Sequence, residues 1–296
     1  MSAFLLLAAA NLLWAGNWLF GRALRDVFEP VELNFWRWVI GAAVLAPFAL
    51  RGVIEKRALI RRHAGVLLLL ALTGVVLFQL LVYLGLQSTT AVNGVLLNSS
   101  SPLFILLCSW IMERERVTAR QLVGVLISLA GILVILSRGE LDNLLTLEFH
   151  VGDAWVLLAM PVWGIYSVLL KRRPPALGGL EFLFVIAAAG VVMLAPLYAF
   201  NALHEAPDVP VPAAAIAGVV YIGIGASVFA FVFWNRGVKV VGANAAGFTL
   251  HLLPAFGTVL AIILLGESFG LFHAIGIVTI VAGVVLATRQ TRSAAP

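Results

Sequence analysis

Charged side chains are scarce in this sequence. Asp, Glu, Lys and Arg make up 11% of its 296 residues, whereas 62% are hydrophobic. The mean hydropathy is +1.07. A soluble globular domain carries about 25% charged residues, so the composition excludes an ordinary soluble domain and predicts an integral membrane protein.

Cysteine is nearly absent as well. Cys108 is the single cysteine and lies in an apolar run, which leaves no basis for a disulfide or a thiolate metal site. The histidines are scattered, and no His-Glu-x-x-His pattern or pair of intramembrane aspartates indicates hydrolytic chemistry. We therefore expect neither enzyme activity nor a metal or cofactor.

Ten apolar segments are long enough to cross a membrane, which takes about 20 residues in a helix. They are residues 2–21, 31–50, 64–86, 90–112, 118–137, 152–170, 178–201, 213–235, 241–265 and 269–288. The run from Ala64 to Met112 holds 49 residues without a charge, so it must contain two spans with a break near 87–90. The first segment follows Met1 without a basic region, and we expect it to be retained as a span. The connections are short, so no soluble domain is expected.

Basic residues are distributed unevenly between the two sides of these segments. The connections after the even-numbered segments, with the C-terminal tail, hold 15 Lys or Arg, against 3 on the opposite side. This bias predicts cytoplasmic N- and C-termini in a multi-pass protein of the cell inner membrane. It also accounts for the net charge of +5 without a nucleic-acid partner.

The two halves of the chain repeat each other. A shift of 149 residues aligns Trp14 with Trp163, Glu32 with Glu181 and Leu45-Ala-Pro47 with Leu194-Ala-Pro196. From residue 83 onward a shift of 152 aligns Gly85 with Gly237, Pro102 with Pro254, Glu115 with Glu267, and Gly124 with Gly276. Five spans in each half force the second half to enter the membrane from the opposite face. The predicted fold is all-α, with ten transmembrane helices in one domain, as two inverted repeats (1–145 and 146–296).

This pattern resembles a known family. A tryptophan lies midway along each first span (Trp14, Trp163), a proline in each fourth span (Pro102, Pro254), and a Glu-then-Gly pattern marks each fifth. Over nearly its whole length the chain resembles the drug/metabolite transporter superfamily in its EamA-type branch, and the YddG-type exporters of aromatic amino acids look closest in layout. The resemblance implies a secondary transporter; related branches carry sugars, nucleotide sugars, purines and other amino acids.

Polar residues inside the apolar spans are the candidates for the transport pathway. Lipid cannot satisfy their hydrogen bonds, and Pro102 removes a backbone donor beside the polar stretch Asn98–Ser101. The predicted substrate-binding residues are Trp14, Asn17, Phe78, Gln79, Tyr83, Asn98, Ser99, Trp163, Tyr166, Asn244, Phe248 and His251, with Pro102 and Pro254 as hinges. We expect Trp14 and Trp163 to wall a midplane cavity for a small, partly apolar solute, most simply an aromatic or other neutral amino acid.

Structural explanations stay open for several of these residues. The two tryptophans could only pack between helices, Gln79 could only join two helices, and His251 could be satisfied by a neighbour. Arg37 is expected to snorkel to the interface; the lesser alternatives are a carboxylate ligand in the cavity or a pair with Glu32. Trp36, Trp38, Trp110 and Trp155 are expected to be interface anchors.

The sequence also leaves alternatives open for the transport mechanism and for the oligomeric state. No Asp or Glu lies well inside a span, which favours facilitated movement over proton coupling; with proton coupling, His251 is the candidate. A sugar, nucleoside or drug carrier, a channel or a membrane sensor remain alternatives. The small-residue faces around Gly124 and Gly276 serve either helix packing or a dimer contact, so the expected partners are the solute, the bilayer and at most a weak homodimer.

Overall fold

The computed structural model describes residues 2–89, 91–140, 142–145, 148–204, 211–265 and 270–288, and none of these residues is in a strand. The helices are α1 (Ala3–Ala23), α2 (Pro30–Glu55), α3 (Arg57–Arg62), α4 (Ala64–Ala71), α5 (Phe78–Ser88), α6 (Ala91–Asn98), α7 (Ser101–Glu113), α8 (Ala119–Leu136), α9 (Asp142–Leu145), α10 (Val151–Leu169), α11 (Gly179–His204), α12 (Ala213–Tyr221), α13 (Ala230–Phe248), α14 (Leu252–Leu265) and α15 (Leu271–Thr288). Short π-helical segments, η1 (Leu72–Leu77) and η3 (Ile222–Phe229), and 3₁₀ segments, η2 (Leu170–Arg172) and η4 (Thr249–His251), adjoin them.

Within these described residues, nine helical stretches are long and apolar enough to cross a membrane. They are Ala3–Ala23, Pro30–Glu55, Ala64–Ser88, Asn93–Glu113, Ala119–Leu136, Val151–Arg172, Gly179–Leu203, Ala213–Leu260 and Leu271–Thr288. Eight of them correspond to single predicted segments, and the all-helical membrane architecture is confirmed. The stretch Ala213–Leu260 has 48 residues and covers two predicted segments.

The chain leaves helical geometry inside this long stretch. Gly242 has φ 84° and ψ 163° within α13, a conformation that glycine adopts readily because it has no Cβ. A Cβ at this position would meet nothing within 4 Å, so the backbone conformation rather than packing calls for glycine. A straight helix of this length would span about 72 Å, against roughly 30 Å of hydrocarbon. The break falls just after residue 241, where the last predicted segment but one begins.

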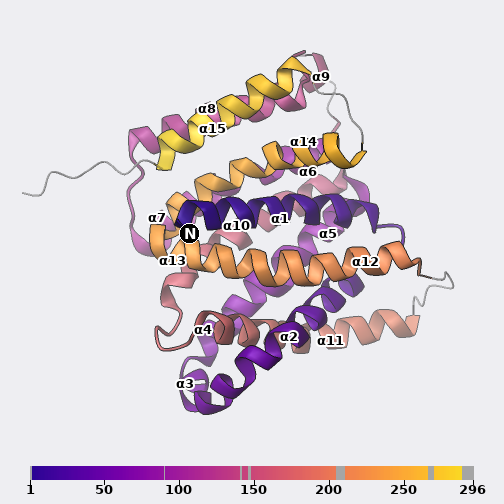
Figure 1. Ribbon diagram of the computed structural model, residues 1–296, viewed down its shortest axis with the longest axis vertical. Coiled ribbons are helices and arrows are strands. Elements are labelled where there is room, and N and C mark those ends of the chain that lie inside the picture. The colour runs from indigo at the N-terminus through magenta and orange to yellow at the C-terminus, as the bar shows by residue number, and fades with distance from the viewer. Residues whose placement is uncertain are drawn as a thin grey trace, which may run out of the picture.

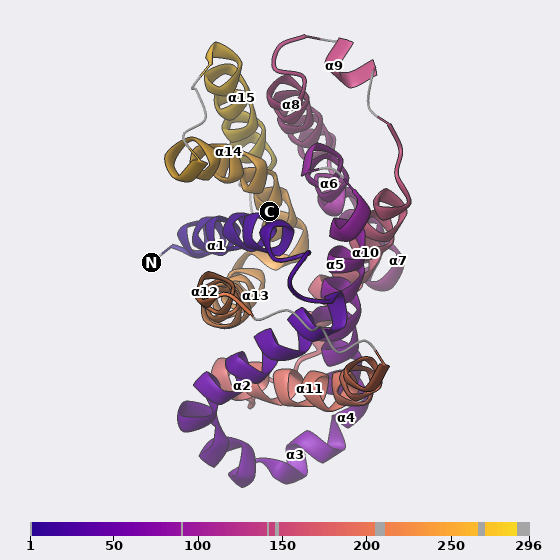
Figure 2. The same ribbon diagram turned by 90° about the vertical axis from the view of Figure 1, so that its right-hand side faces the viewer.

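The helices lie in pairs across the molecule. Figure 1 shows α8 and α15 side by side at one end and α2, α3, α4 and α11 at the other, and Figure 2 shows the same two ends after a quarter turn. Between them lie α1, α5, α10 and α13, with α1 packed on α13 and α5 on α10. This central group carries the residues predicted for the cavity walls.

Small residues allow α8 and α15 to approach closely. A Cβ added to Gly131 would lie 2.7 Å from the carbonyl oxygen of Gly276, and one added to Gly124 would lie 2.6 Å from the backbone nitrogen of Ala287. Both distances are too short for a side chain. The two predicted small-residue faces therefore pack on each other within one chain.

Large apolar side chains cover the outside of the molecule. Phe48, Val192, Ile263 and Val278 are each about 70% exposed or more. Such a surface is unfavourable in water and suits contact with lipid. The outer surface thus agrees with the span lengths.

The two π-helical segments receive hydrogen bonds from other helices. The amide nitrogen of Asn34 on α2 donates to the carbonyl oxygens of Val75 and Val76 in η1, each at 3.2 Å. The indole nitrogen of Trp14 on α1 donates to the carbonyl oxygen of Ala226 in η3 at 3.1 Å. A π-turn departs from the regular hydrogen-bond pattern, and these donors satisfy buried carbonyls that lipid could not.

Candidate functional site

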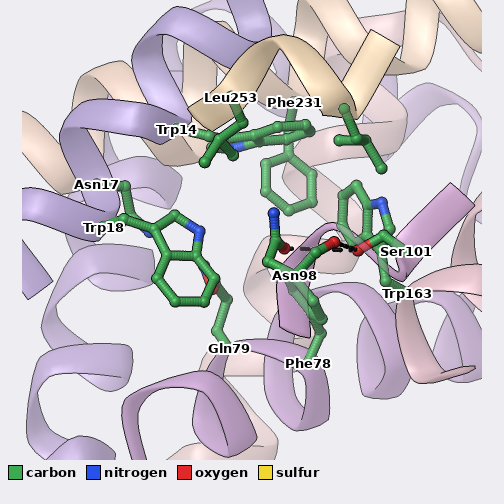
Figure 3. Close-up of a pocket in the computed structure, with 11 residues that line it drawn as sticks. Trp14, Asn17, Trp18, Phe78, Gln79, Asn98, Ser101, Trp163, Phe231 and Leu253 are labelled. Carbon is green, nitrogen blue, oxygen red and sulfur yellow. Dashed lines mark hydrogen bonds between the residues drawn. The ribbon is translucent and has the colours of Figure 1, made fainter. Parts of the chain in front are cut away.

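A central cavity lies where α1, α5, α10 and α13 meet the breaks of the fourth and ninth predicted spans. It is lined by Trp14, Asn17, Trp18, Phe78, Gln79, Asn98, Ser101, Trp163, Phe231, Leu250 and Leu253 (Figure 3). The space between atoms is about 370 Å³, but only about 20 Å³ of it can hold the centre of a water molecule. That is room for about one water, so the lining side chains leave little free space between them.

Aromatic rings form one part of the cavity wall. The ring centroids of Trp14 and Trp163 are 5.2 Å apart at an interplanar angle of 90°, and Phe231 lies 5.7 Å from Trp14. These are the edge-to-face distances that aromatic pairs favour. The indole N–H of Trp163 is buried and has no hydrogen-bond partner in the described part of the chain, which leaves a free donor in the wall.

Asn98 brings a polar group into the aromatic surroundings. Figure 3 shows its side chain directed toward Trp14 and Phe231, with Trp18 and Trp163 on either side. Within the described residues its amide nitrogen has no partner. The hydroxyl of Ser101 donates to the Asn98 carbonyl at 2.6 Å, replacing the helical donor that Pro102 lacks. The helix break thus stays satisfied while the amide faces the cavity.

The cavity lining follows the sequence repeat. The shift of 149 relates Trp14 to Trp163, and the shift of 152 relates Asn98 to Leu250 and Ser101 to Leu253. In each of the last two pairs the first half supplies a polar side chain and the second half an apolar one. The cavity therefore has one polar and one apolar wall.

Hydrogen bonds continue the polar wall away from the cavity. The hydroxyl of Tyr83 donates to the Oδ1 atom of Asn17 at 3.0 Å and accepts from Nη1 of Arg37 at 2.8 Å. The Nε atom of Arg37 donates to the hydroxyl of Ser227 at 2.7 Å. Arg37 is fully buried, so the expectation that it snorkels to the interface is wrong. Its position in the sequence predicts how deep Arg37 lies in the membrane, but not that its side chain points into the protein.

The expectation that Trp38 anchors the membrane interface is also wrong. It is fully buried, and its ring lies 5.1 Å from that of Phe231. The other three expected interface anchors, Trp36, Trp110 and Trp155, are exposed. Trp38 therefore belongs to the aromatic core rather than to the membrane interface.

Tyr166 makes a hydrogen bond like that of Tyr83 in the other half of the chain. Its hydroxyl donates to Oδ1 of Asn235 at 2.9 Å. Position 166 corresponds to Asn17 by the shift of 149, and position 235 to Tyr83 by the shift of 152. The same tyrosine–asparagine contact thus occurs in both halves with the two residues exchanged.

His251 lies in the second helix break, behind the cavity lining. Its Nε2 atom is 2.9 Å from the carbonyl oxygen of Ser99, and its Nδ1 atom contacts the hydroxyl of Ser128 on α8. A carbonyl oxygen only accepts, so Nε2 carries a hydrogen and the contact with Ser128 engages the other nitrogen. Both ring nitrogens are therefore satisfied by neighbouring helices.

A second polar cluster joins the end of α7 to η2 and α13. The Oε2 atom of Glu115 accepts from Ser109 and from Asn244, each at 2.9 Å, and Lys171 contacts the other oxygen. Partial burial by itself raises the pKa of Glu115, but hydrogen bonds from Lys171 and Ser109 and the charge of Lys171 bring that pKa below its ordinary value of 4.5. Glu267, its predicted counterpart, lies outside the described residues.

The structure thus divides the predicted binding residues into two groups. Those that line the cavity are Trp14, Asn17, Phe78, Gln79, Asn98 and Trp163, and those that lie behind it or elsewhere are Tyr83, Ser99, Tyr166, Asn244, Phe248 and His251. Trp18, Ser101, Phe231, Leu250 and Leu253 line the cavity without having been predicted. An apolar residue in an apolar span carries no signal of its own, although the repeat would have found Leu250 from Asn98.

The predicted hinge prolines occupy similar positions in their helices. Pro102 is in the first turn of α7, and Pro254 is in the first turn of α14.

Within the described residues, no group of three or more His, Cys, Asp or Glu side chains could hold a metal ion.

Apolar spans around a central cavity, with helix breaks beside it, define the architecture of a membrane carrier. The EamA-like transporter family matches residues 1–137 and again residues 150–289. The chain belongs to this family, and is thus a multi-pass membrane transporter.

Individual relatives agree with this assignment. The chain is 30% identical over 293 residues to an "Uncharacterized transporter" of Archaeoglobus fulgidus, covering 97% of each chain. It is 29% identical over 279 residues to a "Probable terminal-alkyne amino-acid exporter" of Streptantibioticus cattleyicolor, covering 94% of this chain and 90% of the relative. A solved crystal structure shares the fold at a TM-score of 0.73 and 24% identity, covering 97% of this chain and 96% of that chain.

Proposed function

We propose that this protein exports small amino acids with apolar side chains, aromatic or otherwise neutral, as a secondary transporter working by alternating access. The observation that carries the proposal is the division of the cavity into two walls. Gln79, Asn98 and Ser101 offer hydrogen bonds on one side, and Phe231 and Leu253 offer an apolar surface on the other. An amino acid has the same division between its backbone groups and its side chain.

The name of one relative agrees with this substrate class. The "Probable terminal-alkyne amino-acid exporter" of Streptantibioticus cattleyicolor aligns over nearly the whole chain. Its printed substrate joins an amino-acid group to a small apolar side chain. A sugar phosphate would require several inward-facing basic groups, and the cavity lining holds none among the described residues.

The architecture we propose has ten spans in two inverted repeats, residues 1–145 and 146–296, in one transmembrane domain. The family matches the chain twice, and the break at Gly242 divides the 48-residue stretch in two. The exchanged contacts Tyr83–Asn17 and Tyr166–Asn235 also support a two-fold relation between the halves. The basic residues support cytoplasmic termini in the inner membrane.

Alternating access requires the cavity to open to each side in turn. In our proposal the breaks before Pro102 and Pro254 are the hinges, because the chain there lacks continuous helical hydrogen bonds. The Glu115 cluster would close one end by joining the end of α7 to η2 and α13. Since the described residues that line the cavity include no carboxylate, we propose that movement is driven by the substrate gradient.

Counterflow in proteoliposomes tests the proposed function directly. Vesicles loaded with unlabelled phenylalanine, leucine or another neutral amino acid should accumulate the labelled form only when they contain the protein. Saturation with concentration would distinguish a carrier from a channel. Uptake confined to sugars or nucleosides in the same screen would replace amino acids as the substrate class, and substrate-driven proton uptake would contradict gradient-driven movement.

A further inference from the structure

Arg37 is a buried cation without a counter-ion in the described part of the chain. Its side chain is fully buried, and its hydrogen bonds go to the neutral hydroxyls of Ser227 and Tyr83. The Nη2 atom has no hydrogen-bond partner within the described residues, and the guanidinium carbon lies 5.6 Å and 5.7 Å from the ring centroids of Trp38 and Tyr83. A buried charge is costly unless it is paired. An unpaired arginine held at this depth calls for an explanation beyond packing.

The polar contacts of Arg37 lead to the cavity. Arginine can only donate, so the hydrogen of the Tyr83 hydroxyl is free to go to Oδ1 of Asn17. This orientation leaves the amide N–H groups of Asn17 for the cavity that Asn17 lines. The unpartnered N–H groups of Asn98 and Trp163 line the same cavity. These free groups are all hydrogen-bond donors, and their natural ligand is an anionic acceptor.

The fold itself does not need the arginine. The shift of 149 relates Arg37 to Ile186 and Gly41 to Gly190. A Cβ added to Gly41 would contact Ser227, whereas one added to Gly190 would meet Val75, so Val75 takes the place of Ser227 in the other half. Both counterparts are apolar and fully buried. The same place in the other half of the molecule is therefore filled with hydrocarbon, and the Arg37–Ser227 pair belongs to one half only.

We propose that Arg37 determines specificity for a free carboxylate on the transported solute. The carboxylate binds at the polar wall, where it accepts hydrogen bonds from Asn17 and Asn98. The charge of Arg37 behind that wall then has its missing counter-ion, in a low-dielectric surrounding where such attraction is strong. This inference rests on the proposed transport function, and it selects organic acids and zwitterions over amines and amides that have the same apolar part.

The test compares solutes that differ only in the carboxylate. Binding and counterflow are measured with L-phenylalanine and L-phenylalaninamide, and binding also with 3-phenylpropanoate and 3-phenylpropanamide. The wild-type protein should favour each acid over its amide by roughly tenfold to a hundredfold, the range expected for hydrogen bonds to a charged group. The double variant R37I/S227V, which copies the apolar pair of the other half, should lose this preference while still binding the amides.

Two controls make the result decisive. The Arg51→Gln variant removes an arginine whose side chain is 94% exposed, and it should keep the preference for acids. Size-exclusion profiles and thermal unfolding establish that R37I/S227V is folded, and the single Arg37→Gln variant gives a second measurement. Equal binding of acids and amides by the wild type, or an unchanged preference in a folded variant, would overturn the proposal.

Failure of the transport function is distinguishable from failure of this inference. If no amino acid is transported, the proposed function is wrong, but the binding of 3-phenylpropanoate against its amide still decides the role of Arg37. If neither is bound by the wild type, the carboxylate site is refuted.

Discussion

At the scale of the residue, Trp14 has two roles: it makes a structural hydrogen bond, and it lines the cavity. Its N–H group donates to Ala226, and its ring faces Trp163 and Phe231. The Trp14→Phe variant should keep an aromatic wall and lose about 1 kcal/mol of unfolding free energy with the hydrogen bond. The Trp14→Ala variant removes the wall, and we expect its half-saturation concentration in counterflow to rise by about tenfold.

Trp110→Ala is the matched control for these two variants. Trp110 is also a tryptophan of a predicted span, but it is 51% exposed on the outer surface, so its removal should leave counterflow unchanged. Thermal unfolding of each variant separates loss of binding from loss of fold. A folded Trp14→Ala protein with wild-type affinity would remove Trp14 from the binding surface.

The sequence predicts the role of some single residues and not of others. Trp14 and Asn98 could be predicted because polar groups in an apolar span need a protein or cavity partner. The same rule applies to Arg37, yet sequence alone allows either an inward or a snorkelling side chain. Asn244 shows the related ambiguity, since its amide is used by Glu115 rather than by the cavity. Sequence gives the need for a partner, and only the fold identifies the partner.

At the scale of the element, α8 and α15 depend on glycine for their contact. We expect Gly131→Ala to lower the unfolding free energy by roughly 1–3 kcal/mol, because a methyl group would have to displace the backbone of α15. Gly65 on α4 is the control, since a Cβ there meets nothing within 4 Å. Gly65→Ala should be neutral or slightly stabilising, as alanine is the better helix former. Thermal unfolding in one detergent compares the two, and equal effects would contradict the close contact.

The Glu115 cluster predicts a pH dependence of the junction between α7, η2 and α13. Because the pKa of Glu115 is lowered in the folded protein, its stabilising contribution is fully present above the ordinary value of 4.5 and is lost as the pH falls through the lowered value. The wild type should therefore unfold at a higher temperature than Glu115→Gln at neutral pH, and the difference should disappear in acid.

Glu55→Gln is the control for that comparison. Glu55 pairs with the exposed Arg51, and exposed pairs contribute little, so the unfolding temperature of the Glu55→Gln variant should follow that of the wild type at each pH. A difference between wild type and Glu115→Gln that persists unchanged below the carboxyl range would assign the stability to something other than the Glu115 charge.

At the scale of the whole molecule, span lengths are the part of the fold that sequence determines best. Eight predicted segments match the helical stretches because the hydrocarbon thickness sets their length. The arrangement of the spans follows from contacts that composition does not contain. The pairing of α8 with α15, for example, depends on where Gly124, Gly131 and Gly276 meet.

The number of spans decides on which sides the two ends of the chain lie. Ten spans put both termini in one compartment, whereas a continuous crossing by Ala213–Leu260 would give nine and put them on opposite sides. We expect ten, because the chain turns at Gly242, and the basic residues predict the cytoplasm for both ends. Reporter fusions active in only one compartment should place both termini in the cytoplasm, and one inserted after Leu145 outside it. A C-terminal reporter on the far side would refute the inverted repeat, and with it the symmetry that pairs Arg37 with Ile186.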